Sequence, residues 1–224
     1  MANYCIMRFQ KHKTSAIAKV ERHQNEREHL KNRAHPERKN KTIKRHQDET
    51  MLQTVKRLQK EQEKRTGKKV RKDSVALVEI VLTFSPEAEE HIKRNFMEWY
   101  RKNIQWLKDT FGSENLIRCD INRDQKTLHL HTYIVPIDER GNFNAKKWFG
   151  KKGQLEKLQD TYAEYMAEFG LERGLSKDIT KAIHQTKQQY ERKMAKLLDD
   201  IFEDKPTPHK VEPIRSSIAD EILR

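Results

Sequence analysis

A long apolar segment in the first half of the chain predicts a central β-strand. Residues 74–84 read SVALVEIVLTF, and apolar side chains on both faces are typical of a strand that is buried on both sides. Two later apolar segments, 115–122 and 127–136, are separated by the polar turn 123–126, which predicts an antiparallel hairpin. Residues 3–9 predict a fourth, short strand, so we expect a small antiparallel sheet.

End signals and apolar spacing between these strands predict helices. Ser85 fits an N-cap, Pro86 the first helical position and Glu87 an acidic first turn, so one helix is expected from there to Phe111. Apolar stripes and Gly or Pro breaks predict further helices at Ala16 to Asn32, Asp48 to Arg65, Gln154 to Phe169, and Ser176 to Phe202. The polar residues 37–47 are expected to form a loop or a frayed helix.

The order of these elements is typical of an α+β domain in which a small antiparallel sheet carries helices on one face. The aromatic side chains within 85–111 lie at helical spacing, so we interpret them as core and not as platforms for base stacking.

The charge of the chain favours a polyanionic partner. Lys and Arg number 47 against 34 Asp and Glu, a formal net charge of +13. The basic residues concentrate in 8–72, and a charge gathered in one half of a chain is typical of a nucleic-acid footprint, because binding releases counterions from phosphates. No apolar run is long enough for a membrane segment. Cys5 and Cys119 have no partner spacing, which predicts a reducing, cytoplasmic location.

Two histidines in the last predicted strand could bind a metal ion. Alternation places His129, His131 and Tyr133 on one face of the strand. Two imidazoles spaced in this way can ligate one divalent cation and leave positions open for substrate oxygens. A His-x-His pattern is more often two surface histidines, but here the strand around it is apolar.

Glu79 and His23 have settings that bear on catalysis, although composition alone does not single out His23 among the ten histidines. Glu79 is a lone carboxylate within an apolar strand, and a charge there is costly unless it is paired or ligates a metal. One interpretation pairs it with an arginine; the other places it beside the two histidines. His23 lies on a helix crowded with cations, which lower the pKa of a histidine and favour a neutral, nucleophilic imidazole.

At these residues the chain resembles the Pre/Mob, or MobV-type, plasmid mobilisation relaxases of the HUH endonuclease superfamily. The resemblance runs from residue 1 to about 195 and rests on the order and spacing of short motifs: Tyr4–Gln10, His23 with Asn25-Glu26-Arg27, Arg38 with Asn40, Arg71-Lys72-Asp73 before Glu79, His129-Leu130-His131 before Val135-Pro136, Leu171-Glu172-Arg173-Gly174, and His184 to Lys187. It implies an HUH relaxase-like fold for a relaxase domain of residues 1–195. It also implies that residues 196–224 are a C-terminal extension, either the start of an oligomerisation region or a truncated one.

The resemblance also implies a reaction. In this family a histidine attacks the scissile phosphate at the origin of transfer and forms a covalent His–5′-phosphate intermediate, while a divalent cation, Mn²⁺ or Mg²⁺, polarises the phosphate. By position, His23 is similar to that nucleophile, and His129 and His131 are similar to two of the three metal ligands.

This sequence departs from the family at three positions of the metal motif. The family reads His-x-Asp-Glu-x-x-Pro-His-x-His, and Asn122, Gln125 and Leu128 stand here in place of the first His, the Glu and the Pro. Asn122 can still offer a carbonyl oxygen, which suits Mg²⁺ or Mn²⁺ better than Zn²⁺. Asp120 is a rival third ligand: a two-residue turn would place it opposite His129, and a longer turn would place Asn122 there.

A second departure lies in the first helix. Gln24 separates His23 from Asn25, where the family has a tighter His-Asn pairing, so the alignment admits a shift of one residue. The candidates for contacts with DNA are Arg22, Asn25, Arg27, Arg71, Lys72, Arg173 and Lys187.

The leading hypothesis is a relaxase that nicks one strand of single-stranded or hairpin origin DNA, with relaxosome or coupling proteins and a homodimer as further partners. The alternative is a non-catalytic or weakly catalytic DNA-binding protein on the same fold, since the third metal histidine is replaced. A rolling-circle replication initiator shares the chemistry but uses a tyrosine, and Tyr162 and Tyr165 fall on an apolar stripe.

Overall fold

The computed structural model describes residues 3–26, 35–44, 48–151 and 153–174, together with Gln189 and Arg192. The chain divides into two units, 1–176 and 177–224, and the elements below belong to the first unit. The helix predicted for 176–202 and the extension 196–224 lie outside the described residues, apart from Gln189 and Arg192.

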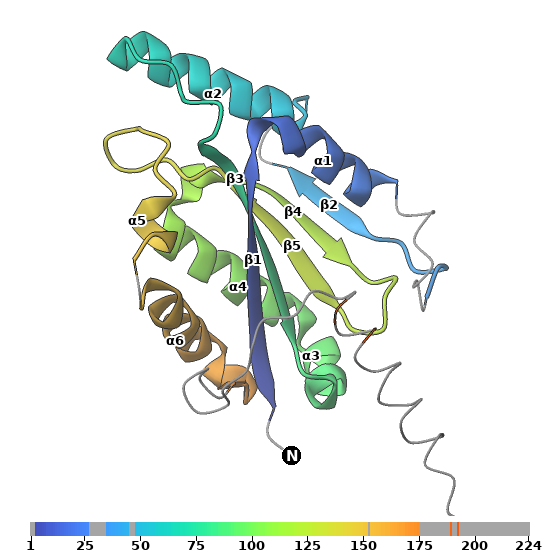
Figure 1. The fold of residues 1–224 in the computed structure, drawn as a ribbon. Coiled ribbons are helices and arrows are strands. Elements are labelled where there is room, and N and C mark those ends of the chain that lie inside the picture. The colour runs from blue at the N-terminus through green and yellow to red at the C-terminus, as the bar shows by residue number, and fades with distance from the viewer. Residues whose placement is uncertain are drawn as a thin grey trace, which may run out of the picture. The chain divides into compact units, whose positions relative to one another are not determined.

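A six-stranded sheet of order β2-β4-β5-β3-β1-β6 forms the centre of the first unit (Figure 1). The predicted antiparallel sheet is confirmed: every neighbouring pair is antiparallel except β1 and β6, which are parallel. The strands are β1 (Tyr4–Lys13), β2 (Lys41–Lys44), β3 (Val75–Phe84), β4 (Leu116–Asn122), β5 (His129–Ile134) and β6 (Glu172–Arg173).

Three strands differ from the sequence prediction. β1 runs four residues beyond Phe9, through the basic sequence Gln10–Lys13. β2 lies in the segment predicted as a loop, and β6 is a pair of residues with no strand prediction. Exposed edge strands such as β2 bury little on either face and therefore lack the apolar alternation on which the prediction depends.

The helices predicted within the described residues are present with different bounds, and the short helix at 146–149 was not predicted. The described helices are α1 (Ile17–Asn25), α2 (Met51–Thr66), α3 (Glu89–Arg94), α4 (Phe96–Phe111), α5 (Lys146–Phe149) and α6 (Gln154–Met166). The single helix predicted to end at Phe111 is broken at Asn95, whose carboxamide donates to the carbonyl oxygen of His91 at 3.0 Å. Such a side-chain bond to the backbone competes with the helical ladder.

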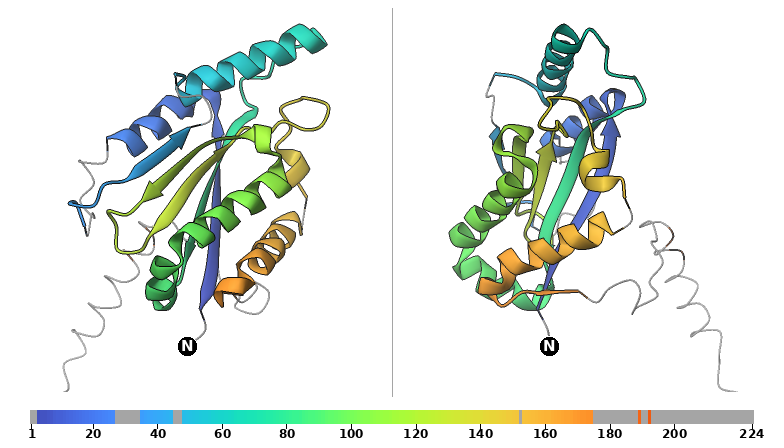
Figure 2. Two further views of the ribbon diagram at one scale, coloured as in Figure 1. Left: turned by 180° about the vertical axis from the view of Figure 1, so that it is seen from behind. Right: turned by 90° about the vertical axis from the view of Figure 1, so that its left-hand side faces the viewer.

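Helices pack on both faces of the sheet (Figure 2), so the prediction of helices on one face is wrong. On one face α3, α4 and α6 bury the larger core, which includes the fully buried Trp99 and Trp106 and so confirms these aromatics as core. On the other face α1 and α2 bury a smaller core around Ile17, Met51 and Val55. Their apolar stripes are narrow because this face of the sheet is largely polar.

No helix in the described ranges is long and apolar enough to span a membrane. Cys5 and Cys119 are buried free thiols, and burial raises the pKa of Cys5 to about 11.

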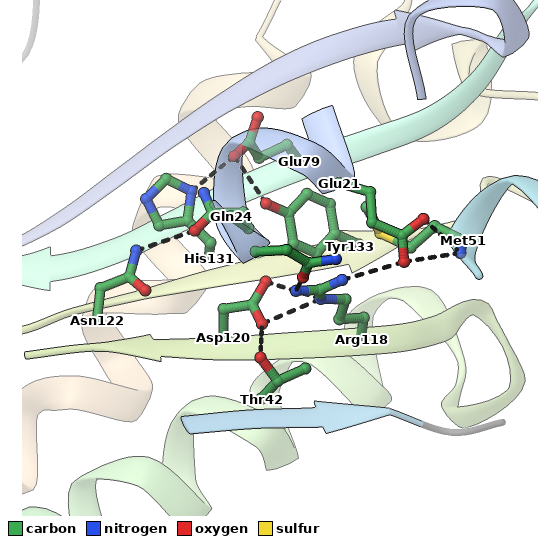
Figure 3. Close-up of polar contacts among 11 residues, drawn as sticks. Glu21, Gln24, Thr42, Met51, Glu79, Arg118, Asp120, Asn122, His131 and Tyr133 are labelled. Atoms are coloured by element: carbon green, nitrogen blue, oxygen red, sulfur yellow. Dashed lines mark hydrogen bonds and ion pairs between the residues drawn. The ribbon is translucent and has the colours of Figure 1, made fainter. Parts of the chain in front are cut away.

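A buried arginine joins the smaller helical layer to the sheet. Arg118 of β4 donates from Nε to both carboxylate oxygens of Asp120 at 2.8 and 3.0 Å, and from Nη1 to Glu21 of α1 at 3.2 Å (Figure 3). Its Nη2 donates to the side-chain oxygen of Asn25 at 2.8 Å. Glu21 in turn accepts the backbone N–H of Met51, the first residue of α2. One guanidinium thus ties β4 to α1, and through Glu21 to α2.

We expect Arg118→Met to lower the free energy of unfolding by about 3–5 kcal/mol, because the carboxylates of Asp120 and Glu21 would stay buried without their cation. Urea unfolding measures the change. Arg94→Met, on an exposed position of α3, is the matched control and should change stability by less than about 0.5 kcal/mol. Similar small changes in both variants would contradict a structural role for Arg118.

Candidate functional site

The register of the β4–β5 hairpin decides which polar side chains meet. Asn122 lies opposite His129, and Asp120 lies opposite His131. The connection spans residues 123–128, longer than a two-residue turn, so the alternative register with Asp120 opposite His129 is wrong. Alternation places all of these side chains on the face that α1 covers.

Both histidines have the same basic ring nitrogen, Nε2. Nδ1 of His129 lies 2.9 Å from the backbone oxygen of Thr127, and Nδ1 of His131 lies 2.6 Å from Oε1 of Glu79. Both partners can only accept, since Glu79 is ionised, so each Nδ1 carries the proton and each Nε2 is left as the basic nitrogen. The ring centroids are 5.1 Å apart. Outer partners of this kind orient metal-binding histidines in proteins.

Glu79 lies beside the histidines, as one of its two interpretations predicted, and not with an arginine. Its Oε1 accepts from His131 and from the hydroxyl of Tyr133 at 3.2 Å, and its Oε2 lies 3.1 Å from Nε2 of His12. Burial alone would raise the pKa of Glu79, but the hydrogen bonds from His12 and His131 hold it well below its usual range. Glu79 is therefore a carboxylate at neutral pH.

His12 is a site residue that the sequence analysis missed. It is buried at the end of β1, within the basic sequence Gln10-Lys11-His12-Lys13. The only signal that could have found it is the alternation of a strand continued to residue 13, which puts His12 on the same face as Arg8 and Gln10.

Helix α1 brings Gln24, and not His23, to the histidine pair. Nδ2 of Asn122 donates to Oε1 of the buried Gln24 at 3.2 Å (Figure 3). The same Nδ2 lies 3.3 Å from Nε2 of His129. His23 is exposed. With 3.6 residues per turn, His23 and Asn25 lie about 160° apart around the helix axis. His23 is therefore on the flank of α1 opposite the contact between Asn25 and Arg118.

The side chains near the histidine pair suit a divalent cation that accepts oxygen ligands. The carboxylate of Asp120 is engaged by Arg118 and by Oγ1 of Thr42 at 2.6 Å, so it is held in that network. Within the described residues, no group of three or more His, Cys, Asp or Glu side chains is arranged to hold a metal. The donors that a cation would find here are His129, His131 and the carboxamide of Asn122, whose oxygen would have to turn toward the rings.

An open cleft adjoins both histidines. It is lined by Val81, Thr83, Gln125, Lys126 and Thr127 together with the two rings. Lys126 gives this cleft a cation, and Gln125 is the residue that stands in place of the family's glutamate. The cleft can therefore admit an anionic group next to the nitrogen pair.

Only some of the residues predicted to contact DNA lie close together. Arg71 and Lys72 line a second cleft with Lys56 of α2, and Arg71 also bonds to Asp73. Arg22 is exposed on α1. Asn25 is held by Arg118, and Arg173 in β6 forms an ion pair with Asp160 at 2.9 Å. Arg27 and Lys187 lie outside the described residues.

We expect Glu79→Gln to destabilise the fold more at neutral than at acid pH. The pKa of Glu79 is lowered in the folded state, so its stabilisation is complete above the usual value of 4.5 and is lost as the pH falls below it. Urea unfolding of both proteins at about pH 7 and about pH 3 measures the difference, which should shrink in acid. The same difference at both pH values would contradict an ionised, hydrogen-bonded Glu79.

Comparisons with known proteins agree with this architecture. The family model Mob_Pre, described as plasmid recombination enzyme, matches residues 1–192. The 65 kDa protein of Zymomonas mobilis is 35% identical over 170 residues, 74% of this chain and 29% of that protein. Plasmid recombination enzyme type 1 of Staphylococcus aureus is 29% identical over 85 residues, 38% of this chain and 20% of that enzyme.

A solved structure is also similar. The MobM relaxase domain, Mn-bound and in complex with plasmid pMV158 oriT DNA, superposes with a TM-score of 0.73 at 25% identity, covering 85% of this chain and 100% of that one. The chain thus spans the whole of that relaxase domain but less than a third of the length of the two curated relatives.

Proposed function

Since the chain belongs to the Mob_Pre family of plasmid recombination enzymes, we propose that it is a DNA relaxase that binds the origin of transfer of a mobile element and nicks one strand by metal-assisted transesterification. The observation that carries the proposal is the pair of Nε2 atoms on His129 and His131, fixed by Glu79 and Thr127 beside an open cleft. Similarity to a relaxase domain bound to oriT DNA and manganese supports it.

His129, His131 and the oxygen of Asn122 would hold the cation, Mn²⁺ or Mg²⁺. Bound there, it would act as a Lewis acid on the scissile phosphate. Lys126 of the same cleft attracts and orients the phosphodiester. Glu79 keeps His131 in the tautomer that offers Nε2.

His23 is the proposed nucleophile. A neutral imidazole nitrogen attacks phosphorus, a P–N bond forms, and the bond from phosphorus to the 3′-oxygen breaks. The other ring nitrogen loses its proton and the departing oxygen gains one, which leaves a 3′-hydroxyl on the DNA. His23 is exposed on the flank of α1 away from Arg118, and a strand lying in the cleft would have to reach it there. Arg22, Arg71 and Lys72 are proposed to contact phosphates, and Asn25 to act by holding α1 on Arg118.

The alternative, a non-catalytic DNA-binding protein on this fold, is favoured by one observation. Gln24 occupies the place on α1 that faces Asn122 and the histidines. A carboxamide is not a nucleophile for phosphate transfer, so an alignment shifted by one residue would remove the attacking group. Relaxosome proteins, coupling proteins and a homodimer remain predicted partners.

We expect Mn²⁺ to raise the melting temperature of the wild-type protein, because a ligand that binds only the folded state stabilises it. His129→Ala should abolish the rise, and Asn122→His should enlarge it by replacing a weak oxygen donor with an imidazole. Scanning fluorimetry with Mn²⁺, Mg²⁺, Co²⁺ and Ni²⁺ measures this, with His91→Ala on the exposed face of α3 as control. A wild-type protein indifferent to all four ions would make the pair structural.

The nucleophile can be identified by the chemistry of the covalent adduct. A histidine phosphoramidate is labile in acid and stable in alkali, so wild type incubated with origin-bearing supercoiled plasmid and Mn²⁺ should give an acid-labile protein–DNA adduct on a denaturing gel. His23→Ala should form no adduct but should still bind the DNA. Gln24→Ala should still form the adduct. An acid-stable adduct would refute the histidine mechanism. No wild-type adduct, with a gain on Gln24→His, would establish the non-catalytic alternative.

A further inference from the structure

We propose that His12 is a positioning residue of the metal centre, acting through Glu79 to hold His131 in its ligand tautomer. The proposal rests on the proposed function of the His129–His131 pair and adds a residue from a strand outside the β4–β5 hairpin.

His12 of β1 contacts Glu79 diagonally on the neighbouring strand β3. In the β1–β3 register His12 lies opposite Leu77, and Gln10 lies opposite Glu79. Diagonal neighbours in an antiparallel pair are within reach of long side chains. The register shifts between His12 and Lys13, and bulges of this kind re-aim side chains next to functional sites. Gln10 is exposed, whereas His12 is buried.

The hydrogen bonds of Glu79 show what His12 contributes. Oε1 accepts hydrogen bonds from Nδ1 of His131 and from the hydroxyl of Tyr133. Oε2 accepts one from Nε2 of His12 at 3.1 Å. The terminal torsion of a glutamate is broad, so bonds on one oxygen alone allow the carboxylate to swing. A bond on the second oxygen fixes its plane. His131 then meets a fixed acceptor, which keeps its proton on Nδ1 and Nε2 toward the cleft.

A purely structural role explains these contacts less well. β1 and β3 already pair from Cys5 to Lys13, so the sheet does not depend on one more side-chain bond. A buried His–Glu pair also costs desolvation that an apolar pair would avoid. This desolvation cost is explained if the orientation of Glu79 matters to His131.

The test compares donor-free and donor-keeping substitutions in the full chain. His12→Leu and His12→Met remove the donor and keep most of the volume, and the second serves if the first does not fold. His12→Gln keeps an N–H near the position of Nε2. His91→Leu, at an exposed position of α3, is the matched control.

Calorimetric titration with Mn²⁺ gives the first readout. His12→Leu or His12→Met should weaken Mn²⁺ binding about 10-fold, the lower end of the effect of outer-shell partners on metal affinity. His12→Gln and His91→Leu should bind as wild type does. In a double-mutant cycle with Glu79→Gln the losses should not add, because His12 acts through Glu79.

The second readout needs no metal. Nitrogen-15 spectra of histidine-labelled protein should give a single His131 tautomer, protonated at Nδ1, in wild type and His12→Gln, and a mixture of tautomers in His12→Leu. An unchanged tautomer together with unchanged Mn²⁺ affinity in the donor-free variants overturns the proposal. If wild type binds no Mn²⁺, the metal part of the proposed function fails, and the tautomer spectra alone decide whether His12 positions His131.

Discussion

The buried guanidinium of Arg118 is the interaction on which the rest of the site depends. It is fully shielded from solvent, and its partners come from β4 itself and from α1. A cation in this position is tolerated only because two carboxylates and a carboxamide surround it. The same network sets α1 across the sheet, and α1 carries both Gln24 and His23. The hydrogen bonds of Arg118 to Glu21 and Asn25, together with the apolar contacts of Ile17, thus hold α1 on the sheet.

On the polar face of the sheet, His129 and His131 are held by hydrogen-bond partners, and one of those partners is held in turn by further side chains. Each ring has one acceptor behind it, Thr127 or Glu79, and Glu79 has its own partners, His12 and Tyr133. This order pre-sets which nitrogen of each ring is basic before any ligand arrives. Asn122 is the carboxamide beside the two rings, and in the proposed function it would be a weaker donor to the cation than an imidazole.

Three carboxamide side chains at this site stand where catalytic groups would be expected. Gln24, Asn122 and Gln125 are neutral side chains at positions where imidazole or carboxylate would give nucleophilic or acid–base chemistry. They preserve shape and hydrogen bonding, so the proposed binding of a DNA strand does not require the replaced groups. In the proposed function, bond cleavage depends on His23, which lies one position from the residue that faces the pair.

The sequence alone determined the buried strand β3, the hairpin of β4 and β5, the face shared by His129 and His131, and the family, because each is written in local periodicity or motif spacing. It did not determine β2, the helices on both faces, the pairing of Asn122 with His129, or the role of His12. Edge strands and polar docking faces carry no apolar alternation, and hairpin register depends on how many residues the turn takes up. His12 meets Glu79 across 67 positions of sequence, and only the tertiary fold brings them together, because neither residue carries a local mark of its partner.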